Sequence, residues 1–231
     1  MTDDELRRAV LDANLDTVRH GLVISTFGNA SGIDRDAGRI LIKPSGVAYD
    51  RLTPADMVPC DLDGRSLDNR LRPSSDLATH AVLYRAFADI GGVVHTHSTY
   101  ATIMAQSHRP IPCLGTTHAD YFHGTIPVTR DLTAEEIAQD YVGNTGAVIV
   151  ETFADLDPLA MPAVLVAGHG PFTWGRTPAE AVHNALILEQ VAKMAWHAMV
   201  LNPDPQPISQ ALLDRHFLRK HGAQATYGQD G

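Results

Sequence analysis

The chain has 231 residues, of which 12 are histidine and two are cysteine, and its formal net charge at pH 7 is -9. This length suffices for one domain with a sizeable core, so neither a disulfide nor a metal is needed merely for folding. The acidic balance, without an extended Lys/Arg cluster, argues against binding to nucleic acid or to an anionic membrane. No apolar run approaches the roughly 18 residues of a membrane span, so we expect a soluble, cytoplasmic protein. Cys60 and Cys113 form no CxxC motif, so a metal site would use imidazoles and carboxylates.

Helices and strands alternate along the chain. Capping boxes, a proline after a capping threonine and glycine stops mark the helices, and short apolar runs between turn residues mark the strands. In chain order, the patterns predict a helix over residues 2–21, strands at 38–44 and 57–62, a helix from Ser75 to Gly91, a strand at 93–97, a helix from Thr133, strands at 147–150 and 163–166, a helix from Thr177 to about Leu201 and, after a proline-containing linker, a C-terminal helix. Because many strands look hairpin-like, we expect an α/β sheet with helices on both faces rather than a purely parallel sheet.

His95 and His97 give the sharpest local signal for chemistry. In a strand, residues i and i+2 point to one face, so two imidazoles can converge on one cation. The alternative is a pair of polar residues on a solvated face, but the apolar approach at residues 91–94 indicates burial, and buried imidazoles need partners. His169, between two glycines, would by itself be interpreted as a histidine in a surface turn. With His95 and His97 it completes a three-imidazole set of the kind that binds zinc and leaves a position for water or substrate.

Three loops rich in Gly and Ser suit a phosphate group. Residues 73–76 stand at an expected helix start, where backbone N–H groups, two hydroxyls and the helix dipole attract an anion, although plain N-capping is the simpler alternative. Residues 28–32 and 43–46 are each consistent with an ordinary turn. Together with Lys43, the three loops could surround one phosphate. None of them matches a P-loop or a dinucleotide-binding glycine motif.

Two further residues, Asp120 and Tyr227, are candidate proton carriers. A loop aspartate or a tail tyrosine is usually solvated, and spacing alone singles out neither. The other histidines, including His80 on the helix expected to begin at Ser75, are expected to be structural.

Seven blocks of the chain resemble the class II aldolase and adducin family. The blocks are residues 28–31, 42–47, 73–76, 94–98, 115–122, 168–172 and 218–222. They follow the family's order over nearly the whole chain, and they are most similar to the blocks of members that epimerise a ketopentose phosphate. The resemblance implies a single-domain three-layer α/β/α fold with a central, mainly antiparallel sheet. It also implies one catalytic domain over residues 1–231, with a C-terminal helix and tail at 207–231 that contribute to the site, and a C4 homotetramer whose sites form between subunits.

The resemblance also implies roles for individual residues. The implied metal ligands are Asp76, His95, His97 and His169, with Zn²⁺ as the expected ion and Mn²⁺ or Co²⁺ as alternatives. The implied contacts to substrate and phosphate are Gly28, Asn29, Lys43, Ser45, Gly46, Ser74 and Ser75. Asp120 and Tyr227 resemble the acid/base pair, and we expect them to serve the metal site of a neighbouring chain.

The activity that the resemblance implies is the interconversion of L-ribulose 5-phosphate and D-xylulose 5-phosphate. The C4 hydrogen of these sugars is not acidic, whereas the C3–C4 bond lies β to the C2 carbonyl. Retro-aldol cleavage, rotation of glycolaldehyde phosphate and re-addition would therefore invert C4.

Two alternatives remain beside this activity. The first is an aldolase of the same family that cleaves fuculose or rhamnulose 1-phosphate; those relatives tend to have Glu where this chain has Asp76. The second is a non-catalytic adducin-like module, which the complete set of three histidines disfavours.

Overall fold

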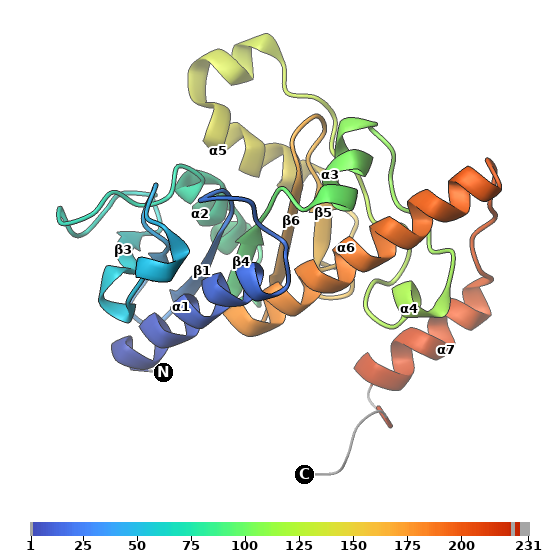
Figure 1. Cartoon of the computed structure of the whole chain (residues 1–231), viewed down its shortest axis with the longest axis horizontal. Coiled ribbons are helices and arrows are strands. Elements are labelled where there is room, and N and C mark those ends of the chain that lie inside the picture. The colour runs from blue at the N-terminus through green and yellow to red at the C-terminus, as the bar shows by residue number, and fades with distance from the viewer. Residues whose placement is uncertain (1, 223–224, 227–231) are drawn as a thin grey trace.

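The chain folds into one six-stranded sheet with helices on both faces (Figure 1). The computed structural model describes residues 2–222 and 225–226. The strands are β1 (Asn29–Asp34), β2 (Arg39–Ile42), β3 (Val58–Asp61), β4 (Gly92–His95), β5 (Ala163–Leu165) and β6 (Pro171–Gly175). The helices are α1 (Asp3–Arg19), α2 (Leu77–Ala86), α3 (Thr99–Gln106), α4 (Thr116–Ala119), α5 (Ala134–Thr152), α6 (Pro178–Leu201) and α7 (Gln210–His221), with short 3-10 turns at Tyr49–Arg51 and Pro54–Asp56.

The strands are ordered β3-β2-β1-β4-β6-β5, and every pair of neighbours is antiparallel. α1 and α6 pack together on one face of the sheet, and α2 packs on the other, against α5 (Figure 1). The expected three-layer α/β/α fold with a mainly antiparallel sheet is therefore confirmed.

Alternation along the two central strands separates an apolar face from a polar one. Ala30 and Val94 point toward α1 and α6 and pack there in one buried cluster. The adjacent residues on the two strands, Asn29, Ser31 and His95, point to the opposite face. Both Asn29 and Ser31 form hydrogen bonds with side chains of the α2 segment. The polar side chains of the central strands are thus gathered under α2.

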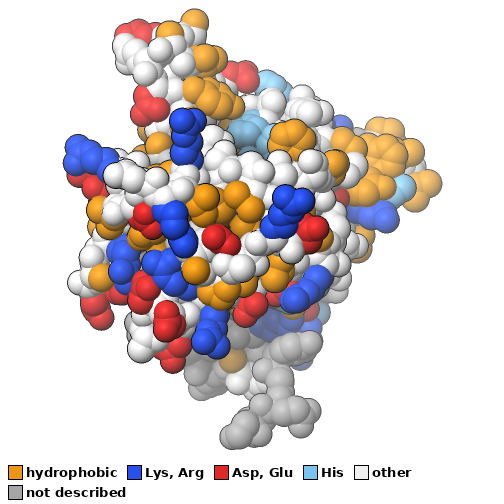
Figure 2. Space-filling view, turned by 60° about the vertical axis from the view of Figure 1, so that its left-hand side comes forward, with side chains coloured by type: hydrophobic (Ala, Val, Ile, Leu, Met, Phe, Trp, Pro, Cys, Tyr) orange, Lys and Arg blue, Asp and Glu red, His pale blue; other side chains and the backbone are white. Residues whose placement is uncertain are grey.

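Charged side chains of both signs are interspersed across one face of the molecule, and histidine side chains also reach the surface there (Figure 2). Among the helices in the described part of the chain, none combines the length and the apolar character needed to cross a bilayer.

The apolar run at residues 147–150 belongs to α5 and not to a strand, so that prediction is wrong. The helix begins with the predicted capping box of Thr133 and Glu136, bends at Asp140, and then continues through the run, where Val148 and Ile149 are buried. A short apolar run has no period of its own by which a strand can be told from a buried helical turn. Packing against α2 decides the matter in favour of the helix.

Residues 28–32 were expected to form a loop, but from Asn29 onward they form part of the central strand β1. Residue 32 of this strand is a glycine because there is no room for a side chain: a Cβ atom would come within 2.8–2.9 Å of side-chain atoms of Val10, Leu6 and Pro178. A glycine inside a strand here marks the close approach of two helices rather than a turn. The patterns also gave no signal for β6, the strand that follows the 168–170 turn.

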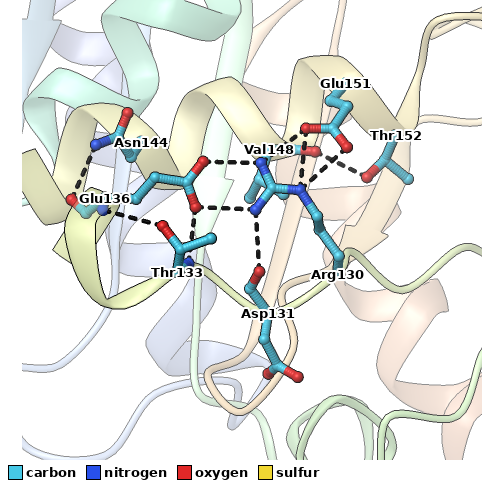
Figure 3. A network of polar contacts seen from close by, with 8 residues as sticks. All are labelled: Arg130, Asp131, Thr133, Glu136, Asn144, Val148, Glu151 and Thr152. Atoms are coloured by element: carbon cyan, nitrogen blue, oxygen red, sulfur yellow. Dashed lines mark hydrogen bonds and ion pairs between the residues drawn. The ribbon is translucent and has the colours of Figure 1, made fainter.

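The helix α5 is bent, and its first half stands away from the body of the molecule (Figure 1). The bend lies at Asp140, whose φ of -159° and ψ of 83° are not helical. Arg130 ties both halves together: its guanidinium donates to Glu136 before the bend at 2.8–2.9 Å and to Glu151 after it at 2.9–3.1 Å (Figure 3). The hydrogen bonds from Arg130 lower the pKa of Glu136 to about 2. Single exposed ion pairs add little stability, but a bidentate network fixes geometry, so the clamp holds the bend.

We predict that Gly92→Ala destabilises the fold, because the added Cβ atom would lie 2.5 Å from the backbone N and Cα atoms of Pro178 at the start of α6. The expected loss is roughly 1–3 kcal/mol of unfolding free energy, the usual effect of overpacking, measured by urea denaturation. Gly115→Ala is the control, since nothing lies within 4 Å of its Cβ position and its φ of -165° is extended. That variant should change stability by at most about 0.5 kcal/mol. Equal denaturation midpoints for the two variants would contradict the argument.

Candidate active site

Three histidine side chains converge at the ends of two strands on the α2 side of the sheet. His95 is the last residue of β4, His97 follows beyond its end, and His169 lies in the turn between β5 and β6. The predicted strand at 93–97 is thus too long at its end, and the Nε2 atom of His97 lies 3.2 Å from that of His95. The ring centroids are 4.7–5.0 Å apart, and the potential ligand atoms lie within 4.8 Å of one another.

The buried His95 ring has a defined orientation. Its Nδ1 atom lies 2.9 Å from the carbonyl oxygen of Pro171, which can only accept, so Nδ1 carries the proton and Nε2 keeps its lone pair. Phe172 stacks on the ring at a centroid distance of 4.2 Å. Burial lowers the pKa of His95 to about 3, and burial together with the neighbouring His97 lowers the pKa of His169. Both rings are neutral at pH 7, which is the form that binds metals.

These residues fit a divalent metal ion. Two nitrogen atoms bound to one tetrahedral ion at about 2.0–2.1 Å would be roughly 3.3 Å apart, close to the 3.2 Å between the Nε2 atoms of His95 and His97. Imidazole nitrogen is a preferred ligand of several first-row transition metals, zinc among them. The three histidines therefore form a group that can hold a metal ion.

Asp76 lines the same cavity as the three histidines, and its side chain is ionised. It occupies the N-cap position of α2, where Ser75 was expected, but its side chain makes no capping hydrogen bond. Its Oδ2 atom instead accepts a hydrogen bond of 2.5 Å from the side-chain amide of Asn29. Burial alone would raise the pKa of Asp76, but its interactions with His95 and His80 and the hydrogen bond from Asn29 together hold it below its usual value. Its role as a metal ligand stays a prediction.

The histidines open into a cavity of about 380 Å³. It contains every metal and substrate residue implied by the resemblance, apart from the acid/base pair. The lining residues are Thr26, Phe27, Gly28, Asn29, Lys43, Pro44, Ser45, Gly46, Ser74, Ser75, Asp76, His95, His97 and His169. Thr26 and Phe27 are the lining residues that lie outside the sequence motifs.

Two of the Gly/Ser loops are joined through their backbones. The N–H of Ser74 donates to the carbonyl of Lys43, and the N–H of Ser45 donates to the carbonyl of Arg72, each at 2.9 Å. Lys43 is only 1% exposed, with its ammonium 3.3 Å from the carbonyl oxygen of Pro44. Burial lowers its pKa. Hydroxyls, a buried cation and the N-terminus of α2 thus face one space, which suits a phosphate.

The loop at Gly28 approaches the metal-binding strand closely. Gly28 has a φ of +81°, and a Cβ atom there would lie 2.7 Å from a methyl carbon of Val23 and 3.0 Å from the carbonyl oxygen of His95. The hydroxyl of Tyr49 donates to the carbonyl oxygens of Phe27 and Gly28 at 3.0 and 2.9 Å. Only glycine fits this position without displacing the backbone that carries His95.

Asp120 lies elsewhere, next to α7. His216 and Arg219 donate to its carboxylate at 2.9–3.2 Å, and the ammonium of Lys220 lies 3.8 Å away. Burial would raise the pKa of Asp120, but the hydrogen bonds from Arg219 and His216 and the charge of Lys220 lower it overall, so the group is ionised. Within residues 2–222 and 225–226, the residues that line the histidine cavity do not include Asp120. Tyr227 lies outside the described residues.

Tyr141 is a neighbour of the site that the sequence did not indicate. Its hydroxyl lies 3.4 Å from the Nδ1 atom of His169, although the residue is 42% exposed. Tyr141 directly follows the bend at Asp140, and no periodic pattern in the sequence reveals that bend. A lone surface tyrosine gives no signal of its own.

A larger hollow of about 830 Å³ lies between α1 and the segment 53–70. Two of its arginines, Arg7 and Arg70, are paired with aspartates, Arg7 with Asp3 and Arg70 with Asp56 and Asp68. No group of converging metal ligands was found there in the described part of the chain. The smaller cavity is the candidate active site because ligand, cation and hydroxyl groups meet in it.

The fold and the site together define a class of protein, and the chain belongs to the class II aldolase and adducin family. Residues 8–196 match the family described as "Class II Aldolase and Adducin N-terminal domain". Among curated proteins, the chain is 53% identical over 225 residues to L-ribulose-5-phosphate 4-epimerase UlaF from Salmonella paratyphi A and from Salmonella typhi. Each match covers 97% of this chain and 99% of the relative.

Solved structures support the same fold. An L-fuculose 1-phosphate aldolase is similar with a TM-score of 0.78 at 23% identity, covering 92% of this chain and 94% of that chain. The L-fuculose 1-phosphate aldolase from Glaciozyma antarctica PI12 has a TM-score of 0.76 at 19% identity and covers 97% of this chain and 84% of that chain.

We predict that His97→Asn lowers metal content, because it removes one of three converging nitrogens. The loss of affinity should exceed the roughly 10–100-fold that follows from losing a supporting contact, measured as bound metal after dialysis. His108→Asn is the control: His108 has a φ of +52°, a conformation that asparagine tolerates, and its nearest charged partner is Asp131 on the surface. Full metal content in His97→Asn protein would refute the ligand assignment.

Proposed function

We propose that this protein interconverts L-ribulose 5-phosphate and D-xylulose 5-phosphate by inverting C4. The observation that carries the proposal is the meeting of a three-histidine group and a phosphate-binding set of loops in one cavity. Relatives that are 53% identical over nearly their whole length carry the name of that epimerase. The cavity volume of about 380 Å³ is within the range of small-molecule sites.

The substrate phosphate would bind at the joined loops. Ser45, Gly46, Ser74 and Ser75 offer hydroxyl and backbone N–H donors, and the buried Lys43 offers charge. This grip leaves the other end of the sugar facing the histidines. It also keeps the phosphorylated fragment from leaving when the carbon chain is cleaved.

We propose zinc as the ion held by His95, His97 and His169, with Asp76 as the fourth ligand. When bound, such an ion supplies Lewis-acid stabilisation of negative charge on substrate oxygen atoms. The chain contributes neutral imidazoles, one of them oriented by the Pro171 carbonyl, and a carboxylate that Asn29 and its surroundings keep ionised.

The chemistry at C4 requires a base and an acid on opposite faces of the aldehyde. One of Asp120 and Tyr227 would take the proton of the C4 hydroxyl as the C3–C4 bond breaks and its electron pair passes to the C2 carbonyl. After the aldehyde has turned, the C3–C4 bond re-forms and the other group returns a proton to the C4 oxygen. Arg219 and His216 keep Asp120 ionised and hence able to accept a proton.

We further propose a C4 homotetramer in which the Asp120 cluster of one subunit, with the 207–231 segment, completes the cavity of the next. Asp120 does not line the histidine cavity of its own chain within the described residues. Its side chain is nevertheless held in one orientation by α7, as a group presented to a neighbouring subunit would be.

The direct test is an assay of the metal-loaded protein with L-ribulose 5-phosphate, with and without a chelator. We expect D-xylulose 5-phosphate to form, and the chelator to stop its formation. Release of free dihydroxyacetone without D-xylulose 5-phosphate would instead indicate an aldolase. A metal-loaded protein that leaves the substrate unchanged would contradict both activities.

A second test asks whether Asp120 acts across subunits. Asp120→Asn should keep the fold and the metal but lose on the order of 10²-fold or more in rate. Co-expressing Asp120→Asn and His97→Asn chains should restore about a quarter of wild-type activity, because in a closed ring half the cavities keep the metal and half of those face an intact Asp120. Pairing His97→Asn with His95→Asn is the control and should restore none. The absence of rescue in the first mixture would place Asp120 in the cavity of its own chain.

A further inference from the structure

Three buried polar side chains form a line that leads from the core toward the candidate site. Ser31, His80 and Tyr84 are each 0% exposed. The Nδ1 atom of His80 lies 2.7 Å from the hydroxyl oxygen of Ser31, which lies 2.8 Å from the hydroxyl oxygen of Tyr84. Buried polar groups are costly unless they are hydrogen-bonded, and connected networks of them fix a unique arrangement. A hydrogen-bonded line of this kind, in a layer of otherwise apolar side chains, suggests that it positions a functional group.

The hydrogen bond between Ser31 and His80 runs parallel to the one between Asn29 and Asp76. His80 stands one helical turn after Asp76, and its backbone N–H donates to the Asp76 carbonyl at 3.1 Å, so the two side chains share a face of the α2 segment. On β1, Asn29 and Ser31 share a face in the same way. Four residues of helix rise about 6 Å and two residues of strand about 6.6 Å. The two spacings match, so Asn29 contacts Asp76 while Ser31 contacts His80.

The hydrogen-bond pattern fixes which nitrogen of His80 carries its proton. A fully buried imidazole is neutral, because burial disfavours its charged form, and it therefore has one N–H. If Tyr84 donates to Ser31 and Ser31 donates to Nδ1 of His80, every hydroxyl proton in the line is used. The reverse direction would leave the phenol proton of Tyr84 without an acceptor in the line. The proton of His80 is therefore on Nε2.

The Nε2 atom of His80 is buried and makes no hydrogen bond with the described residues. His80 lies one helical turn from Asp76, and its ring packs edge to face with Phe172 at a centroid distance of 6.0 Å, while Phe172 also stacks on His95. His80 thus lies between the carboxylate and the ring that support the candidate metal site. A buried N–H beside an ionised carboxylate is a donor suited to that carboxylate.

We propose that His80 is a positioning residue for Asp76: its Nε2–H group, which makes no hydrogen bond with the described residues, donates to the Asp76 carboxylate once a metal ion draws that carboxylate toward the three histidines, and Ser31 and Tyr84 fix the tautomer that makes this group a donor. The inference rests on the proposed metal site. It accounts for a carboxylate at a helix N-cap position that does not cap its helix. Ligating carboxylates are held by such supporting hydrogen bonds, which tune metal affinity.

The test compares two substitutions that each keep one end of the imidazole. In His80→Asn the amide can replace Nδ1 but not Nε2, and in His80→Gln it can replace Nε2. Zinc affinity, measured by competition with a chromophoric chelator, should fall about 10–100-fold in His80→Asn and stay within about threefold of wild type in His80→Gln. Thr79→Val is the matched control, since Thr79 is the buried neighbour whose hydroxyl donates to the Val142 carbonyl. It should lower the urea midpoint and leave zinc affinity unchanged.

Wild-type zinc affinity in His80→Asn would overturn the inference, as would an equal loss of affinity in Thr79→Val. If neither His80 variant folds, Ser31→Ala decides: it leaves Nδ1 without its donor, so zinc affinity should fall, and an unchanged affinity would overturn the inference. Wild-type protein that binds no zinc would contradict the proposed metal site itself. That result differs from the case in which wild type and His80→Asn bind zinc equally well, which contradicts the role of His80 alone.

Discussion

The antiparallel pairing of β1 with β4 is the constraint on which the rest of the site depends. Its register sets Asn29 opposite His95, so both project to the same face of the sheet. A shift of β1 by one residue against β4 would turn Asn29 toward α1 and α6 and bring Ala30 under α2, so that Asn29 would no longer share a face with His95. The opposite end of the same ladder pairs Gly32 with Gly92, and both lie against Pro178 at the start of α6. The glycine pair fits there in one register only, so helix packing at one end of the strands secures the polar end.

The parts of the site differ in how they are held. The three histidines lie on a strand or in the segment that follows one, and backbone hydrogen bonds join the two loops around Lys43 and Ser74. Asp120 is instead held by the side chains of a separate helix, among them His216 and Arg219. The basic residues of α7 keep the carboxylate of Asp120 ionised, which is the state that its proposed role as a proton carrier requires.

Much of the fold could be predicted from local signals. Capping boxes at Thr2 and Thr133 and the Thr177-Pro178 start identified three helices, because capping is settled within four residues. β1 and the 147–150 segment could not be identified in this way. In both, contacts with distant helices override local preference: Gly32 suggests a turn until α1 and α6 are placed over it, and the 147–150 run suggests a strand until α2 is placed beside it.

In the candidate site, too, some features follow from local sequence signals and others only from tertiary contacts. Asp76, His95, His97, His169 and the Gly/Ser loops share one cavity, as the motifs implied, because each motif includes the turn that directs its side chain. Tyr141 was missed because only the bend in α5 brings it to His169. His80 was interpreted as structural because its surroundings, Ser31 and Tyr84, come together only in the folded chain. Sequence motifs indicated which groups lie in one cavity; what orients those groups depends on tertiary contacts.

Because of the Arg130 clamp, Tyr141 and the histidine beside it differ in their sensitivity to the salt concentration of the medium. Its ion pairs with Glu136 and Glu151 are exposed, so dissolved salt screens them over a Debye length of about 8 Å at physiological ionic strength. The contact between His95 and the Pro171 carbonyl is buried and is hardly screened. Rising ionic strength would therefore loosen the bend that carries Tyr141 while the histidines keep their places. The contact that Tyr141 makes beside His169 can therefore yield to the ionic medium, whereas the histidines held by the sheet cannot.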